Sequence, residues 1–233
     1  MHAIENDVRQ KLAIAHHVIA YYGWDELVAT HLSARMPDSD AILITPKNTA
    51  FKNVTEENLV KLNLDGEYLS DNGHTVLEQA ANIHLETYKV RRDIHSIIHT
   101  HSMYSTIISS LTTGFKFTTQ HSLRFYDDIA YHPFDGLAFE NEGAAIANSL
   151  GNKRVLFANN HGVITTGGSI EETLLYHYHL ENCCETLVKT LQCSEEIIDI
   201  PDDICKLTKA QFDKIKTPHV EFAYFADLVR SVG

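Results

Sequence analysis

The sequence is short of positive charge and of long apolar runs. Its 233 residues contain 19 Lys and Arg against 31 Asp and Glu, which gives a formal net charge of −12. Proteins bind nucleic acids and anionic membrane surfaces through basic patches, so this balance argues against both partners. No apolar run approaches about 18 residues, and the chain does not open with a basic segment followed by an apolar one. We therefore expect neither a transmembrane helix nor a signal peptide.

Cysteine, glycine and proline are also scarce. The sequence has 11 Gly and 5 Pro, and it shows no internal repeat, low-complexity tract or linker. The cysteines all lie late in the chain, and none forms a C-x-x-C pair: Cys183, Cys184, Cys193 and Cys205. This pattern is typical of reduced packing thiols in a cytoplasmic protein. We predict a single domain spanning 1–233, in which the more polar stretch 193–233 is a peripheral C-terminal tail.

Hydrophobic periodicity predicts alternating helices and strands. Residues 7–22 have helical spacing and end at Gly23, which suits a C-cap. Ser169 and Glu172 form a capping box that opens a long helix to about Leu191. The other expected helices are 77–93, 102–111, 142–151 and 222–230. The expected strands are 27–36, 41–46, 94–101 and both arms of 154–167, with a hairpin within 60–70. We predict an α/β fold.

Two H-x-H pairs occur among the 15 histidines, whereas random placement gives about one. The expected secondary structure separates the two pairs. On a strand, residues i and i+2 face the same way, so His99 and His101 project side by side and can share a metal ion. On a helix the same spacing turns by about 200°, so His177 and His179 cannot chelate one ion together. We interpret the second pair as packing or surface residues.

A catalytic zinc site takes three protein ligands and keeps one position open. His161 offers a third imidazole, because it lies in a tight turn between two apolar strands and is followed by Gly162, which permits close backbone approach. The rival third ligands are His95, His121 and His132. The alternative for the whole set is a group of histidines that are hydrogen-bonded to one another.

These motifs resemble those of the class II aldolase/adducin family. That family has an HTHS-like pair, here at 99–102, an NHG turn, here at 160–162, and an ITP strand end, here at 44–46. An LDG hairpin is present at 64–66. The bacterial adducin-like branch is the most similar, through the stretches THLSAR, LRFYDDIAYHPFDG and NNHGVITTGGSIEE. The resemblance runs from about residue 8 to residue 192.

The resemblance implies a three-layer α/β/α sandwich with a mostly antiparallel central sheet. It implies that His99, His101 and His161 hold Zn²⁺ or another divalent transition metal, and that the chain forms a homotetramer. The implied function is a metal-dependent aldolase-type lyase that acts on a small hydroxy-carbonyl or hydroxy-acid through an enediolate-like intermediate, with epimerase or decarboxylase chemistry as relatives of that reaction. The alternative is a non-catalytic adducin-like interaction or metal-binding module.

The sequence departs from the sugar-phosphate aldolases at the catalytic base. Those enzymes carry a Glu four residues before a helix His, and the corresponding positions here are Ala80 and His84. The nearest carboxylate is Glu78, half a turn away, which makes Glu78 the candidate base. It reaches the metal only if the start of the helix shifts or unwinds. The alternative is a solvated Glu at the helix terminus.

The phosphate-binding positions differ as well. The aldolase Asn position is His31 here, the glycine of the TPxG stretch is Asn48, and a serine pair is replaced by Glu78 and Gln79. A carboxylate repels a phosphate unless it is neutralised. We therefore expect His31, with Lys47 and Asn48, to bind an unphosphorylated substrate, such as one carrying a carboxylate.

A proton donor for the product carbon is also needed. The aldolase tyrosine with this role corresponds to a position near His121, whose ordinary pKa lies near neutrality and suits a proton donor or base. Tyr131 is the second candidate. The alternative for both residues is a structural role.

Overall fold

One sheet forms the centre of the computed structural model, which describes residues 2–37, 39–136, 142–193, 195–215 and 217–231. Across these residues seven strands take the order β3-β2-β1-β4-β7-β6-β5. Their bounds are β1 His31–Arg35, β2 Ala41–Ile44, β3 Val60–Asn63, β4 Ser96–Thr100, β5 Ile129–His132, β6 Val155–Ala158 and β7 Gly162–Gly167. Neighbouring strands are antiparallel except β5 and β6, which are parallel. The predicted mostly antiparallel sheet is confirmed.

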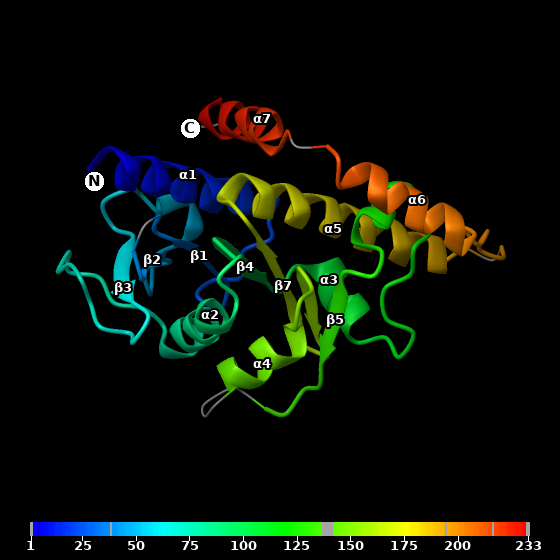
Figure 1. Cartoon of the computed structure of the whole chain (residues 1–233), viewed down its shortest axis with the longest axis horizontal. Coiled ribbons are helices and arrows are strands. Elements are labelled where there is room, and N and C mark those ends of the chain that lie inside the picture. Colours follow the sequence, from blue (N-terminus) through cyan, green and yellow to red (C-terminus); the bar gives the residue numbers. More distant parts are fainter. Residues whose placement is uncertain (1, 38, 137–141, 194, 216, 232–233) are drawn as a thin grey trace.

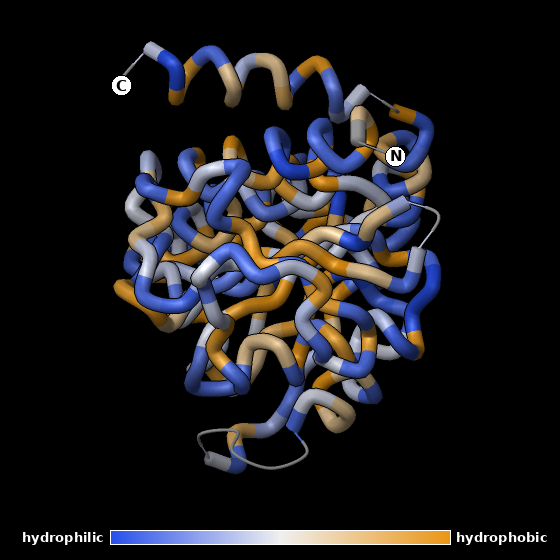
Figure 2. Tube along the Cα trace, turned by 90° about the vertical axis from the view of Figure 1, so that its left-hand side faces the viewer, coloured by the Kyte–Doolittle hydropathy of each residue, from blue (hydrophilic) through white to orange (hydrophobic). Residues whose placement is uncertain are grey.

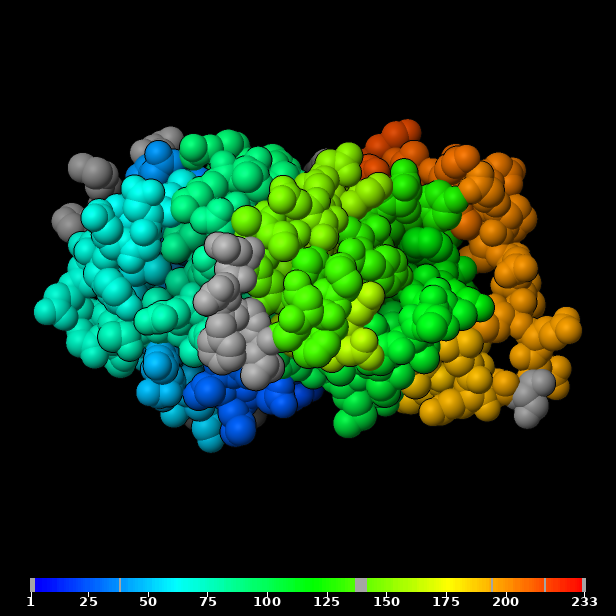
Figure 3. All heavy atoms as spheres, turned by 90° about the horizontal axis from the view of Figure 1, so that it is seen from below, coloured from blue at the N-terminus to red at the C-terminus, as the bar shows by residue number. Residues whose placement is uncertain are grey.

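Helices cover both faces of this sheet (Figure 1). Helices α1 (His2–Tyr21) and α5 (Ile170–Leu191) lie over one face, and α2 (Glu78–Val90) and α4 (Glu142–Leu150) lie side by side over the other, the face seen in Figure 3. The remaining helical elements are α3 Met103–Ser109, α6 Asp202–Phe212, α7 Pro218–Arg230, and the 3-10 turns η1 Phe51–Asn53 and η2 His121–Phe125. These three layers confirm the predicted α/β sandwich. Among the described residues, no helix is long and apolar enough to cross a membrane.

Strand alternation distributes the side chains of β1 between the two layers. Leu32 and Ala34 pack in an apolar cluster with residues of α1. His31 and Ser33 face the opposite way and contact α2. Every residue of β1, β2 and β4 is buried, so the polar side chains on these strands lie inside the protein. Figure 2 shows apolar colour gathered along the strands in the middle of the molecule.

The long helix α5 begins where the capping box predicts. The hydroxyl of Ser169 accepts a hydrogen bond from the Glu172 backbone N–H, and the Glu172 carboxylate accepts one from the Gly168 backbone N–H. These contacts satisfy backbone donors that a helix N-terminus otherwise leaves free. The helix then extends to Leu191, the predicted end.

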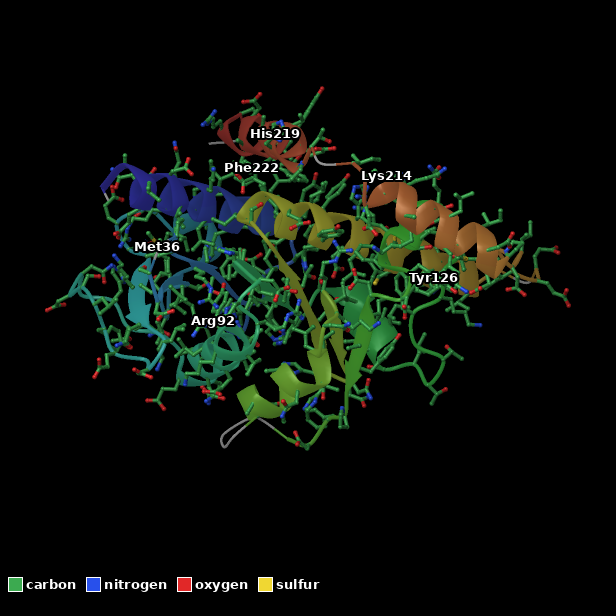
Figure 4. The ribbon with its side chains drawn as sticks, viewed as in Figure 1. Met36, Arg92, Tyr126, Lys214, His219 and Phe222 are labelled. Atoms are coloured by element: carbon green, nitrogen blue, oxygen red, sulfur yellow. The ribbon has the colours of Figure 1, made fainter. Side chains whose placement is uncertain are left out.

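The C-terminal stretch differs from its expectation in two ways. The predicted helix over 222–230 exists but begins at Pro218, a residue suited to the first helical turn. Phe222, labelled in Figure 4, and Phe225 are buried in the cluster that α1 and β1 share. Helix α6 was not predicted, because its sequence is polar and Cys205 is its one buried residue. The division into a single domain with a peripheral tail at 193–233 stays a prediction.

Strand β5 was also not predicted from the sequence. Its four residues, Ile129–His132, form the edge of the sheet and pair in parallel with β6. Three of the four are not fully buried. Tertiary pairing with β6, and not a local apolar pattern, therefore defines this strand.

Candidate metal centre

Three histidines converge at one end of β4. His99 is the fourth residue of that strand, His101 follows the strand, and His161 precedes β7. One ring nitrogen of each lies within 4.8 Å of the other two. The Nε2 atoms of His99 and His101 are 2.9 Å apart, and the His161 ring centroid is 5.0 Å and 4.6 Å from theirs. In the part of the chain that the structure describes, none of the rivals joins this group: His95, His121 and His132.

Hydrogen bonds on the far side of each ring determine which nitrogen faces the group. His99 Nδ1 donates to the backbone carbonyl of Val163 at 3.0 Å, and His101 Nδ1 donates to Glu26 Oε2 at 2.6 Å. A neutral imidazole carries one proton, so both Nε2 atoms present lone pairs. Two such nitrogens at 2.9 Å repel unless a cation lies between them. Two tetrahedral ligands at zinc–nitrogen distances of 2.0–2.1 Å lie about 3.3 Å apart, so the donor set fits a divalent metal.

Burial keeps His99 and His161 in their metal-binding form. For His99, burial and then the neighbouring His31, His101 and His161 hold the pKa well below its usual range. For His161, burial and then His101 lower the pKa to about 4. A neutral imidazole is the form that binds metal. The cluster is therefore suited to hold a cation at neutral pH.

The turn that carries His161 approaches β4 very closely. A Cβ on Gly162 would lie 2.4 Å from the Thr100 carbonyl oxygen and 2.9 Å from His101 Cδ2. No side chain fits there, which confirms the role expected of this glycine. Asn160 takes a left-handed φ of 58°, a conformation that Asn tolerates better than most residues. The turn can therefore place His161 against the end of β4.

Glu26 is a member of this site that sequence reasoning missed. It lies in the turn before β1, 75 residues from His101, so no short motif connects them. A carboxylate that accepts the outer N–H of a metal-binding histidine fixes the ring and raises its basicity. One signal in the sequence points to Glu26, which is its position five residues before His31. His31 begins β1, and β1 pairs with β4, the strand that carries His99.

The second H-x-H pair diverges, as predicted for a helix. His177 is buried on α5, where its Nε2 lies 3.2 Å from Thr100 Oγ1 and its Nδ1 lies 3.1 Å from Thr165 Oγ1. His179 instead stacks against His121, with ring centroids 5.1 Å apart. The two imidazoles thus have separate packing roles.

His31, the predicted substrate-binding residue, lies beside the three histidines. It is the cross-strand partner of His99, and their ring centroids are 4.8 Å apart. Its Nδ1 is 2.7 Å from Nε2 of His84 on α2. It does not belong to the group whose nitrogens lie within 4.8 Å of one another. His31 therefore borders the candidate metal centre without completing it.

The other predicted substrate-binding and base residues lie at the ends of neighbouring elements. Lys47 and Asn48 are exposed after β2, and the Lys47 backbone N–H donates to the Thr75 carbonyl at 2.7 Å. Glu78 is the first residue of α2 and is exposed, so the start of this helix is formed and not unwound. Among the described residues, no hydrogen bond or ion pair joins these side chains to the three histidines. Their proposed roles stay predictions.

The two candidate proton donors lie in different places. His121 begins η2 and packs between His179 of α5 and Phe212 of α6. Tyr131 on β5 accepts a hydrogen bond from the Phe115 backbone N–H at 2.8 Å. It lines a cavity of about 300 Å³ together with 109–114, Asn159 and Asn160. Because Asn160 directly precedes His161, Tyr131 borders the metal-centre turn more closely along the fold than His121 does.

Comparisons with known proteins show the family and the fold to which this chain is similar. A family model described as class II aldolase and adducin N-terminal domain matches residues 10–188. A Pseudomonas aeruginosa protein, PA3430, whose name provisionally assigns it to the class 2 aldolases, is 33% identical over 203 residues, covering 87% of this chain and 78% of that protein. Human gamma-adducin is 33% identical over 193 residues, which cover 80% of this chain but 27% of the adducin. The crystal structure of an aldolase II superfamily protein from Pseudomonas syringae is 27% identical and superposes with a TM-score of 0.92, covering 99% of this chain and 94% of that one.

Proposed function

Because this chain belongs to the class II aldolase and adducin family, we propose that it is a Zn²⁺-dependent lyase of the aldolase type. Its substrate is a small hydroxy-carbonyl or hydroxy-acid. The observation that carries the proposal is the pair of Nε2 atoms of His99 and His101, which lie 2.9 Å apart while both Nδ1 atoms bond to outer acceptors. A divalent ion held between them would remove the repulsion of their lone pairs, and His161 would supply the third ligand.

His99, His101 and His161 would hold the metal, and three protein ligands are the number that a catalytic zinc site takes. A metal held there supplies Lewis-acid stabilisation of the negative charge that develops on a substrate oxygen. The chain's own residues supply orientation: the Val163 carbonyl and the Glu26 carboxylate hold the two β4-end rings with Nε2 inward. Proton transfer at the substrate carbon is assigned to the predicted candidates, which are Glu78, His121 and Tyr131.

The proposal includes assembly into a homotetramer. His121 contacts α5 and α6 within its own chain, Glu78 begins α2, and Tyr131 lines a cavity with Asn160. An oligomer allows a residue that is remote from the site in its own chain to approach the site of a neighbouring subunit. Size-exclusion chromatography with light scattering measures the subunit number directly.

The proposed substrate carries no phosphate. Glu78 is exposed at the start of α2, where the aldolases have a phosphate-binding serine. Its negative charge opposes that of a phosphate. His31 and the exposed Lys47 and Asn48 are the proposed contacts for the uncharged or carboxylate end of the substrate.

Metal analysis and a paired substrate screen test the proposal. We expect about one zinc per chain in the wild type and none in His161→Ala, while His95→Ala, a histidine outside the group, keeps its zinc. Phosphorylated and free forms of the same ketoses and hydroxy-acids are then compared, and the free forms should turn over in the wild type but not in His161→Ala. A wild-type protein that takes up no zinc overturns the metal centre. A clear preference for the phosphorylated forms overturns the substrate class.

A non-catalytic interaction or metal-binding module is the second candidate. The observation that favours it is the 33% identity to human gamma-adducin, which equals the identity to the bacterial relative PA3430. Full zinc occupancy without turnover of any compound in the panel would favour this second candidate over the lyase.

A further inference from the structure

A buried chain of hydrogen bonds leads from α2 to the edge of the candidate metal centre. The Tyr88 hydroxyl lies 2.8 Å from Ser33 Oγ, which in turn contacts His84 Nδ1. His84 Nε2 lies 2.7 Å from His31 Nδ1. All four side chains are buried, and burial lowers the pKa of His84 to about 3, so this ring is neutral. This series of hydrogen bonds ends at His31, whose ring lies beside that of His99.

The direction of these hydrogen bonds is set at the Tyr88 end. Among the described residues, Ser33 is the one hydrogen-bond partner of the Tyr88 hydroxyl. Arg35, whose guanidinium lies 4.8 Å from the Tyr88 ring centroid, can only donate. If Ser33 donated to Tyr88, the buried tyrosine O–H would have no acceptor, and an unsatisfied buried donor is costly. Tyr88 therefore donates to Ser33.

The direction of each following hydrogen bond is then determined. Ser33 has one hydroxyl proton, and with Tyr88 donating to its oxygen it donates this proton to His84 Nδ1. The neutral His84 ring then carries its proton on Nε2 and donates it to His31 Nδ1. His31 Nδ1 thus accepts a hydrogen bond and carries no proton, so the proton of this ring lies on Nε2. In this arrangement the Tyr88 hydroxyl, the Ser33 hydroxyl and His84 Nε2 each donate to an acceptor.

We propose that this hydrogen-bond chain fixes His31 as a neutral N–H donor, with its proton on Nε2, for an acceptor oxygen of the substrate, and so prevents it from serving as a fourth metal ligand. The opposite tautomer would present a lone pair beside three histidines and would favour a closed, structural four-ligand site. The hydrogen-bond chain would thereby keep one coordination position of a bound metal open. His31 lies outside the group of nitrogens within 4.8 Å of one another, so its position as well as its tautomer separates it from the candidate ligands. The inference rests on the proposed function, which it deepens by assigning substrate recognition to His31 and positioning roles to His84, Ser33 and Tyr88.

The tautomer is measured directly by two-bond ¹⁵N–¹H correlation spectra of protein labelled at histidine, in the zinc-loaded and the metal-free state. Comparison with His31→Gln assigns the His31 signals. We expect a protonated Nε2 and an unprotonated Nδ1 on His31 in both states. A proton on Nδ1, or direct zinc coordination of Nε2, overturns the inference. The metal-free spectrum reports the tautomer even if the proposed zinc site fails, so the two failures are distinguishable.

Variants of His84 test the consequence for binding, with glycolate as the probe and calorimetry as the measurement. His84→Leu removes the donor to His31 Nδ1, and we expect glycolate to bind the zinc-loaded variant about 3- to 10-fold more weakly, the effect of one hydrogen bond, with unchanged zinc content. His84→Gln keeps an amide N–H donor and should restore most of the affinity. Loss of zinc in His31→Gln would show that His31 is a ligand and would overturn the inference. So would wild-type glycolate affinity in a folded His84→Leu variant.

Discussion

The pair His99 and His101 and the pair His177 and His179 have the same spacing but opposite surroundings. The first lies at the end of β4 with its Nε2 atoms 2.9 Å apart. The second lies on α5, where one ring is buried against the sheet and the other stacks on His121. Strand alternation brings i and i+2 together, whereas a helix turns them apart. The H-x-H spacing therefore predicts a metal centre only together with the secondary structure that presents it.

The two pairs are nevertheless connected. Thr100, between the two β4-end histidines, contacts His177 Nε2 through its hydroxyl, and His177 also contacts Thr165 on β7. Strands β4 and β7 carry or adjoin all three candidate ligands. His177 thus packs against β4 and β7, the strands that position the metal centre. We expect His177 and His179, the packing pair, to affect stability. We expect His99 and His101, the converging pair, to affect metal binding.

Removing one member of each pair gives the largest expected contrast. His99→Ala should lose the metal entirely, because two imidazoles remain where three are required. His179→Ala should keep about one zinc per chain. Both variants should unfold cooperatively, since a domain of this size has its own core and does not need a metal to fold. Elemental analysis and thermal unfolding measure the two properties, and zinc retained by His99→Ala would contradict the assignment of the metal centre.

His177→Ala should show the reverse behaviour. It removes a fully buried side chain and its contacts with Thr100 and Thr165, which should lower the free energy of unfolding by about 2–4 kcal/mol. The matched variant His179→Ala removes a partly exposed ring and should cost about 1 kcal/mol. Zinc content should stay at the wild-type level in both. Urea unfolding gives the stabilities, and equal losses in the two variants would show that the buried contacts of His177 add nothing.

Glu181, one turn after His177 on α5, makes the packing region sensitive to pH. Burial raises the pKa of this carboxyl from 4.5 to about 7, against the opposing effect of the nearby Ser102 and Ser105 hydroxyls. Between these values the folded protein holds a proton that the unfolded chain has released, so stability falls as pH rises from about 4.5 to about 7. The full loss is about 3 kcal/mol at most.

Glu181→Gln should remove this dependence, because a neutral amide needs no proton. The variant should be more stable than the wild type at pH 8 and similar to it at pH 4, as measured by urea unfolding across that range. Glu185→Gln, at a half-buried position of the same helix where the carboxylate pairs with Lys189, serves as the control and should leave the dependence attributed to Glu181 in place. Parallel stability profiles for Glu181→Gln and the wild type would contradict the buried, protonated carboxyl.

The sequence was sufficient to predict those features that local periodicity encodes. The short apolar run within 94–101 and the helical spacing over 170–191 gave β4 and α5, and these two elements distinguish the histidine pairs. The NHG turn made His161 a candidate third ligand, because only glycine at 162 allows that approach to β4. The turn alone left the rival histidines open, and the family resemblance selected His161 among them. Strand β5 could not be predicted in this way, because it depends on pairing with a strand that lies later in the chain.

Contacts between residues distant in sequence account for what the sequence did not predict. The bond between His101 and Glu26 spans 75 residues, and the contact between His84 and His31 spans 53. No spacing rule connects such residues, and only the sheet register, which pairs His31 with His99, brings them together. The same reason applies to His121, whose contact with His179 follows from the docking of η2 against α5.

Glu26 gives the smallest expected effect and the sharpest test of how the converging pair is held. In Glu26→Gln the amide oxygen can still accept the His101 Nδ1 proton, but the negative charge that strengthens the ring as a ligand is lost. We expect zinc to bind roughly tenfold more weakly, with unchanged stoichiometry and stability. Competition with a chelator of known affinity measures the change. Asp25→Asn removes a neighbouring charge without that hydrogen bond and is the matched control. If both variants lose affinity equally, the effect comes from general electrostatics, and Glu26 does not orient His101. If neither loses affinity, the Val163 carbonyl and the turn at Gly162 are sufficient to position the ligands.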